Sequence, residues 1–173
     1  MRHHLPLLAF PVFLLADHVL AEVGKTGSLE DKLTGTLKRY IKALQEGDVK
    51  AYRELRESDF LKREKEFLVK KGRELTSATL KPRNPKAYTR LTAYPVIEAI
   101  QKGLHARLAL LNKNAAQMGH KATEVEIVFV MFKKEADTWK FVRFGPFVIP
   151  RADLTKEKQF PQDKVPDPFR IPK

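Results

Sequence analysis

The sequence contains no cysteine in its 173 residues, so neither a disulfide framework nor a thiolate metal site is available. Histidine is scarce as well, since only His105 and His120 follow residue 21, and no acidic residue lies between Ala99 and Thr123 to orient either ring. A metal site needs three or four convergent ligands, and a general base needs an orienting partner. No metal site, cofactor or catalytic residue is therefore predicted.

The sequence also lacks a glycine-rich phosphate loop and a G-x-S-x-G nucleophile motif. Its net charge of +12 favours anionic partners such as an envelope polymer or a membrane surface. Between Lys62 and Lys86, however, the only aromatic residue is Phe67, which the helical period assigns to a buried stripe, and three glutamates interrupt the basic residues. No specific nucleic-acid partner is predicted, and any polyanion binding should be weak and sensitive to salt.

The one long apolar run is Leu5–Ala16, which has prolines at positions 6 and 11 and is too short to span a membrane. With Arg2 before it and Val19-Leu20-Ala21 after it, the pattern is typical of an export signal over residues 1–21. A buried N-terminal helix is the alternative interpretation. The predicted product is a soluble periplasmic or extracellular protein, with a single α+β domain over residues 22–150 and a tail over residues 151–173.

The predicted domain opens with a helix. Ser28 is a good N-cap, Asp31 completes a capping box, and Gly47 ends the segment. Its apolar positions share one helical stripe: Leu29, Leu33, Leu37, Tyr40, Ile41 and Leu44. Asp48 can cap a second short helix, and Ser58 or Asp59 a third that ends before Gly72.

Two further segments are predicted before the last hairpin. Leu75–Leu80 and Ala87–Thr92 flank two prolines and predict a small hairpin. Pro95 then suits the first turn of a helix whose apolar stripe runs to Gly119. The competing interpretation breaks at Gly103 and makes residues 104–111 a strand, because their apolar residues also alternate.

The clearest pattern is a long hairpin over residues 122–149, in which two β-branched and aromatic runs flank KKEAD. Both of its faces are apolar, so both need cover. A turn centred on Glu135-Ala136 would place Phe132 opposite Trp139, Val130 opposite Phe141 and Val128 opposite Arg143, with Glu126 at the next rung. The other face, with Phe129 and Phe144 among its members, is then expected to pack on the helices.

This order of elements, with a helix ending in ALQEGDVKAYREL, a small hairpin, another helix and a long hairpin closing on TWKFVRF, resembles the nuclear transport factor two-like superfamily over roughly residues 29–147. The resemblance implies a cone in which helices pack on a curved antiparallel sheet that leaves a cavity at its open end. Members include isomerases, dehydratases, hydrolases and non-catalytic binding modules. The long basic segment 57–86 and the tail beyond Pro150 depart from the pattern.

A candidate ligand pocket follows from the expected hairpin face. Its residues are Glu126, Trp139, Phe141, Arg143, Tyr88 and Tyr94. A plain cross-strand ion pair between Glu126 and Arg143 is the alternative. The predicted function is non-catalytic binding of a small apolar or amphipathic ligand or of a protein partner through the sheet cavity; dimerisation of the chain through its open sheet is the alternative within this class. An acid–base enzyme using Glu126, Tyr88 or Tyr94 and an electrostatic binder of anionic polymers are the other two classes.

The tail over residues 151–173 is rich in proline and has no period of a helix or strand, which predicts an extended or disordered segment. Four apolar residues could tether it to a groove of the same chain or of a partner: Phe160, Val165, Phe169 and Ile171. A mobile polar tail is the alternative.

Overall fold

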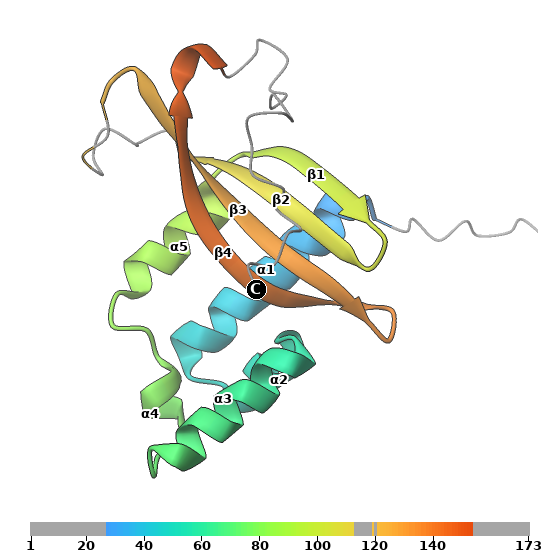
Figure 1. Ribbon diagram of the computed structural model, residues 1–173, viewed down its shortest axis with the longest axis vertical. Helices are drawn as coiled ribbons and strands as arrows, with labels where there is room; N and C mark the ends of the chain where they lie inside the picture. The colour runs from blue at the N-terminus through green and yellow to red at the C-terminus, as the bar shows by residue number, and fades with distance from the viewer. Residues whose placement is uncertain (1–26, 113–118, 120, 154–173) are drawn as a thin grey trace, which may run out of the picture.

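The computed structural model describes residues 27–112, 119 and 121–153, which form helices packed on one face of an antiparallel sheet (Figure 1). The predicted α+β class is confirmed. The helices are α1 (Leu29–Glu46), α2 (Val49–Leu55), α3 (Ser58–Lys70), α4 (Ser77–Leu80) and α5 (Pro85–Ala93). The strands are β1 (Val96–Lys102), β2 (His105–Asn112), β3 (Glu124–Glu135) and β4 (Thr138–Pro150), followed by a short 3-10 turn, η2 (Arg151–Asp153). Their order in the sheet is β1-β2-β3-β4.

Helix α1 begins and ends as the sequence predicts. The Ser28 hydroxyl accepts a hydrogen bond from the Asp31 amide at 3.1 Å, and the Asp31 carboxylate accepts one from the Ser28 amide at 3.1 Å. Gly47 closes the helix in the left-handed conformation, with φ of 71°. Asp48 then caps α2 by accepting a hydrogen bond from the Ala51 amide. The apolar stripe of α1 is thereby aimed at the sheet.

The small hairpin predicted over residues 75–92 is wrong, because both of its segments are helical. Thr76 and Thr79 form a capping box that begins α4. Asn84 caps α5 by accepting a hydrogen bond from the Ala87 amide, and Pro85 occupies the first turn. A proline in the first helical turn leaves no backbone donor unsatisfied and already has helical φ. The prolines around this turn therefore start a helix rather than excluding one.

The helix predicted after Pro95 is also wrong within the described residues, where β1 and β2 form a hairpin that turns at Gly103, with φ of 59°. The alternative strand over residues 104–111 is confirmed, since β2 covers His105–Asn112. β2 is buried on both faces between β1 and β3, so its leucines and alanines fit a central strand despite their helical preference.

The β3–β4 hairpin is confirmed, but its predicted register is wrong. The two-residue turn lies at Ala136 and Asp137, with φ of 45° and 64°. A turn with positive φ at both residues matches the right-handed twist of the strands that it joins. Glu135 therefore pairs with Thr138 and Phe132 with Phe141, and the register shifts beyond that pair so that Met131 faces Arg143. The inserted residue of this β-bulge is Val142, and it moves the following β4 side chains to the opposite faces.

The main core lies between the helices and the sheet face that carries Val128, Val130, Phe132, Trp139 and Phe141. The expectation that the Phe129 face packs on the helices is thus wrong. A second apolar cluster lies on the opposite face, around Ala109, Val125, Ile127 and Ile149, with Phe129 packed against it.

Three predicted segments lie outside the described residues: the export signal over residues 1–21, the end of the predicted helix over residues 113–118, and most of the tail, residues 154–173. Across the part of the chain that the structure describes, no helix combines the length and the apolar character needed to cross a membrane.

Candidate functional site

The predicted pocket residues do not share one place. Trp139 and Phe141 belong to the core beneath α1, where the Phe141 ring stacks on Tyr40 with centroids 4.0 Å apart and planes at 15°. Only 2% of Phe141 is exposed. Tyr88, on α5, packs against the same core and meets Phe144 edge to face at 5.7 Å. Protein side chains therefore fill the space beside Phe141.

Glu126 and Arg143 lie far apart on the ladder. Glu126 faces Val148, whereas Arg143 faces Met131, so the expected cross-strand neighbours are not neighbours. Glu126 is buried and accepts a hydrogen bond from the Asn112 side-chain amide at 3.0 Å. The pKa of Tyr94 is raised by burial first and then by the Glu126 charge. Glu126 and Tyr94 are thus brought near each other, and Arg143 is exposed elsewhere.

Arg56, which sequence analysis missed, lies in an aromatic cage with 7% of its surface exposed. Its guanidinium carbon lies 3.6 Å from the ring centroid of Phe60, 4.8 Å from that of Phe141 and 5.8 Å from that of Tyr40. Nη1 donates to the Phe141 carbonyl at 3.5 Å, while Nε has no hydrogen-bond partner among the described residues. The rings stabilise this cation through their negative faces.

Burial is the main cause of the raised pKa of Tyr40, in this cage, and of Tyr52 beside it. It raises the pKa of Tyr40 to about 12, although the Arg56 charge acts in the opposite direction. The pKa of Tyr52 is raised by burial, by Tyr40 and by Glu64, whose carboxylate accepts a hydrogen bond from the Tyr52 hydroxyl at 2.9 Å. Both phenols therefore stay protonated at neutral pH.

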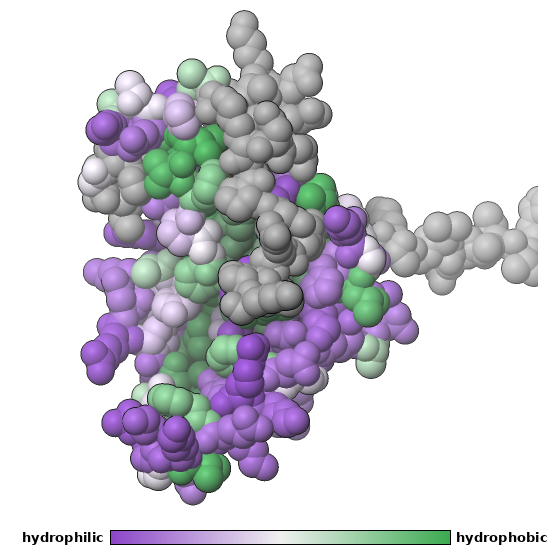
Figure 2. Space-filling view, in the orientation of Figure 1, coloured by the Kyte–Doolittle hydropathy of each residue, from purple (hydrophilic) through white to green (hydrophobic). Residues whose placement is uncertain are grey.

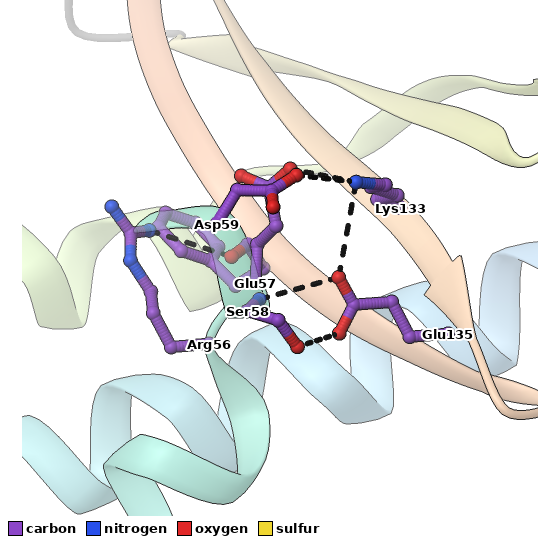
Figure 3. A network of polar contacts seen from close by, with 7 residues as sticks. Arg56, Glu57, Ser58, Asp59, Lys133 and Glu135 are labelled. Atoms are coloured by element: carbon purple, nitrogen blue, oxygen red, sulfur yellow. Dashed lines mark hydrogen bonds and ion pairs between the residues drawn. The ribbon is translucent and has the colours of Figure 1, made fainter. Parts of the chain in front are cut away.

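A polar network fixes the start of α3 against the sheet (Figure 3). Lys133 Nζ lies 3.2 Å from the Glu57 carboxylate and 2.9 Å from that of Asp59. The Ser58 amide and hydroxyl donate to Glu135 at 3.2 and 2.6 Å. The Glu57 amide also donates to the Phe141 carbonyl at 3.1 Å. These contacts explain how α3 is held although no residue of the helix is buried.

A groove of about 460 Å³ runs along the helices, and we call it the helical groove. It is lined by Arg53, Leu61, Glu64, Lys65, Leu68, Val69, Arg73, Glu74 and Leu75. Apolar surface lies among hydrophilic surface where Figure 1 places α3 and α4 (Figure 2). Val69 is 71% exposed and the neighbouring Phe67 58%, so the expected burial of Phe67 is wrong. No described part of the chain covers this side of α3. The helical period of the sequence cannot show this by itself.

A second hollow of about 440 Å³ lies where α1 passes the tips of both hairpins. Trp139 contributes to its wall, together with Lys32, Arg39 and Lys134. Lys134 is paired with Asp137 at 2.9 Å. This hollow is more polar in its residues than the helical groove and contains one residue of the predicted pocket.

Within the described residues, no group of three or more histidine, aspartate and glutamate side chains is placed to hold a metal ion. Comparison with protein-family models, curated proteins and solved structures finds no match to this chain.

Proposed function

We propose that this protein is an exported, non-catalytic member of the cone-shaped α+β class that binds an amphipathic ligand with an acidic head and an apolar body. The observation that carries the proposal is the helical groove, where apolar Leu61, Leu68 and Leu75 line the same hollow as Arg53, Lys65 and Arg73. Pockets for small ligands are mostly apolar with a few placed polar groups. The leucines would take the apolar body, and the basic side chains the head.

The polar pair beside this groove, formed by Glu64 and the buried Tyr52, favours positioning over proton transfer. Glu64 lines the groove and accepts the hydrogen bond of Tyr52. Because burial raises the pKa of Tyr52, its phenol is a poor base at neutral pH. Glu64 can orient a polar ligand group, and its hydrogen bond with Tyr52 holds α2 and α3 together beside the groove.

The test is titration of the purified protein with a fluorescent medium-chain carboxylic acid and with the corresponding neutral alcohol. Leu68→Asp introduces a charge among the apolar lining and should weaken binding of both probes by about tenfold or more, equivalent to roughly 1.4 kcal/mol. Leu104→Asp is the matched control, because Leu104 is 59% exposed and lies in the β1–β2 turn. The control should bind like the parent.

A double variant, Lys65→Gln with Arg73→Gln, separates recognition of the head from recognition of the body. It should weaken binding of the acid several-fold and leave binding of the alcohol unchanged, because only the acid uses the charges. Absence of saturable binding to either probe would refute the proposal. Polyanion binding that Leu68→Asp leaves intact and added salt abolishes would instead support the electrostatic class.

A further inference from the structure

The sheet face opposite the helices, which we call the outer face, contains residues that are almost completely buried. Ala109 and Ile127 are 0% exposed there, and Arg107 only 1%. An antiparallel sheet with helices on one face commonly leaves its other face to water, with polar side chains on it. Here Ala109 and Ile127 are apolar and shielded, and the charged Arg107 on the same face is shielded as well.

Arg107 makes the shielding chemically significant. Its guanidinium is paired with Glu98 and lies over the Phe129 ring, 4.8 Å from the centroid. Its Nε is buried and has no hydrogen-bond partner within the described residues. A charge held on a sheet face is easily hydrated when the face is open, so this burial indicates a cover over the middle of the sheet.

The cover does not come from the described helices. Every described residue of the outer cluster belongs to a strand: Ile97, Ala109, Leu111, Val125, Ile127, Phe129, Phe147 and Ile149. The short connection 113–120 follows the end of β2, whereas Arg107 lies five residues back along that strand, about 17 Å away at ~3.3 Å per residue.

The residues that follow β4 have the position, length and chemistry to form this cover. Ile149 at the end of β4 already belongs to the outer cluster, and the Arg151 amide donates to the Thr123 carbonyl at 2.7 Å. Residues 154–173 could extend about 60 Å at ~3.1 Å per residue, which is longer than the sheet. Their prolines, at positions 161, 166, 168 and 172, lack the N–H donors that an added edge strand would need.

We propose that residues 154–173 lie across the outer face and cover it with Phe160, Val165, Phe169 and Ile171. A proline-rich segment loses less conformational entropy on docking than an ordinary chain, which favours this use of four apolar side chains. Free backbone carbonyls of such a segment would suit the unpartnered Arg107 Nε. The segment would then occupy the face through which a second copy would otherwise dock.

The cysteine-free sequence allows a direct test in the full chain. Arg143→Cys places a thiol on the outer face, and Phe160→Cys or Phe169→Cys places one in the segment. A short bis-maleimide should join these pairs within one molecule, several-fold faster than the same segment thiol joined to Lys42→Cys. Lys42 is the control because its side chain is well exposed on α1, behind the sheet.

A second measurement uses a chain that stops after Asp153 and a full-length chain with serine at positions 160, 165, 169 and 171. Both should bind more of a hydrophobic dye than the parent and melt at a lower temperature. Equal cross-linking at positions 143 and 42, or variants that match the parent in dye binding and melting, would overturn the proposal. Cross-links that form only between molecules would assign the outer face to a second copy. If the shortened chain does not fold, the cross-linking result still decides.

Discussion

Truncation of Phe141 to alanine tests the organisation of the core. The ring stacks on Tyr40, meets Phe132 edge to face at 6.3 Å and lies under Arg56. The backbone carbonyl that Arg56 and Glu57 use remains in the variant. The variant therefore loses the packing of the ring and gains a cavity, and we expect the free energy of unfolding to fall by about 4 kcal/mol.

Urea unfolding followed by the fluorescence of Trp139, the single tryptophan, provides the measurement. The melting temperature should fall by roughly 15 °C, at about 4 °C per kcal/mol for a domain of this size. Phe129→Ala should cost about 2 kcal/mol, because that ring is half-buried on the other face. Phe67→Ala is the exposed control and should cost about 0.5 kcal/mol or less.

A Phe141→Ala variant that unfolds within about 1 kcal/mol of the parent would refute this account of the core. If the alanine variant does not fold, Phe141→Leu, which keeps most of the apolar volume, should still fold and show a smaller loss. A larger cost for Phe129→Ala than for Phe141→Ala would reverse the assignment of the helix-packed face.

Two further predictions follow from a glycine pair and an ion network. At Gly47 a Cβ would clash with Ser77 Oγ and lie 2.7 Å from the Ser77 carbonyl oxygen, whereas at Gly72 it would meet nothing within 4 Å, and φ is positive at both. In thermal melts, Gly72→Ala should therefore lower the free energy of unfolding by about 1 kcal/mol, and Gly47→Ala should lower it clearly more. Equal losses would contradict the close approach of Gly47 to Ser77. Lys133 lowers the pKa of Asp59 below its ordinary 3.8 through a hydrogen bond and its charge, so this stabilisation is present above that pH and is lost as the pH falls. Lys133→Met should flatten the dependence of urea stability between about pH 5 and 3, and an unchanged slope would contradict the pairing.

Local signals predicted the elements that depend on local chemistry. One short segment of sequence contains all the signals for α1, namely the Ser28 capping box, the apolar stripe and the Gly47 end. The β2 strand was ambiguous because its leucines and alanines fit two periods, and only its position between β1 and β3 decides between them.

The candidate site was less accessible to sequence reasoning, for two physical reasons. The bulge at Val142 changes which β4 side chains share a face, and nothing in the residue types marks the insertion. The helical groove depends on the position of α3 relative to Arg73 and Leu75, and tertiary packing sets that position. The stripe on α3 was visible, but its exposure was not.

The neighbour-to-neighbour order of the strands has a consequence for the sequence of events in folding. Each pairing in the sheet joins strands adjacent in the chain, and the β3–β4 connection has two residues, so the hairpins close with little loss of entropy. The contact of Tyr40 with Phe141 instead closes a loop of about a hundred residues, which costs roughly 4 kcal/mol. During synthesis α1 leaves the ribosome long before β4, so Tyr40 stays without its stacking partner Phe141 until β4 has been made.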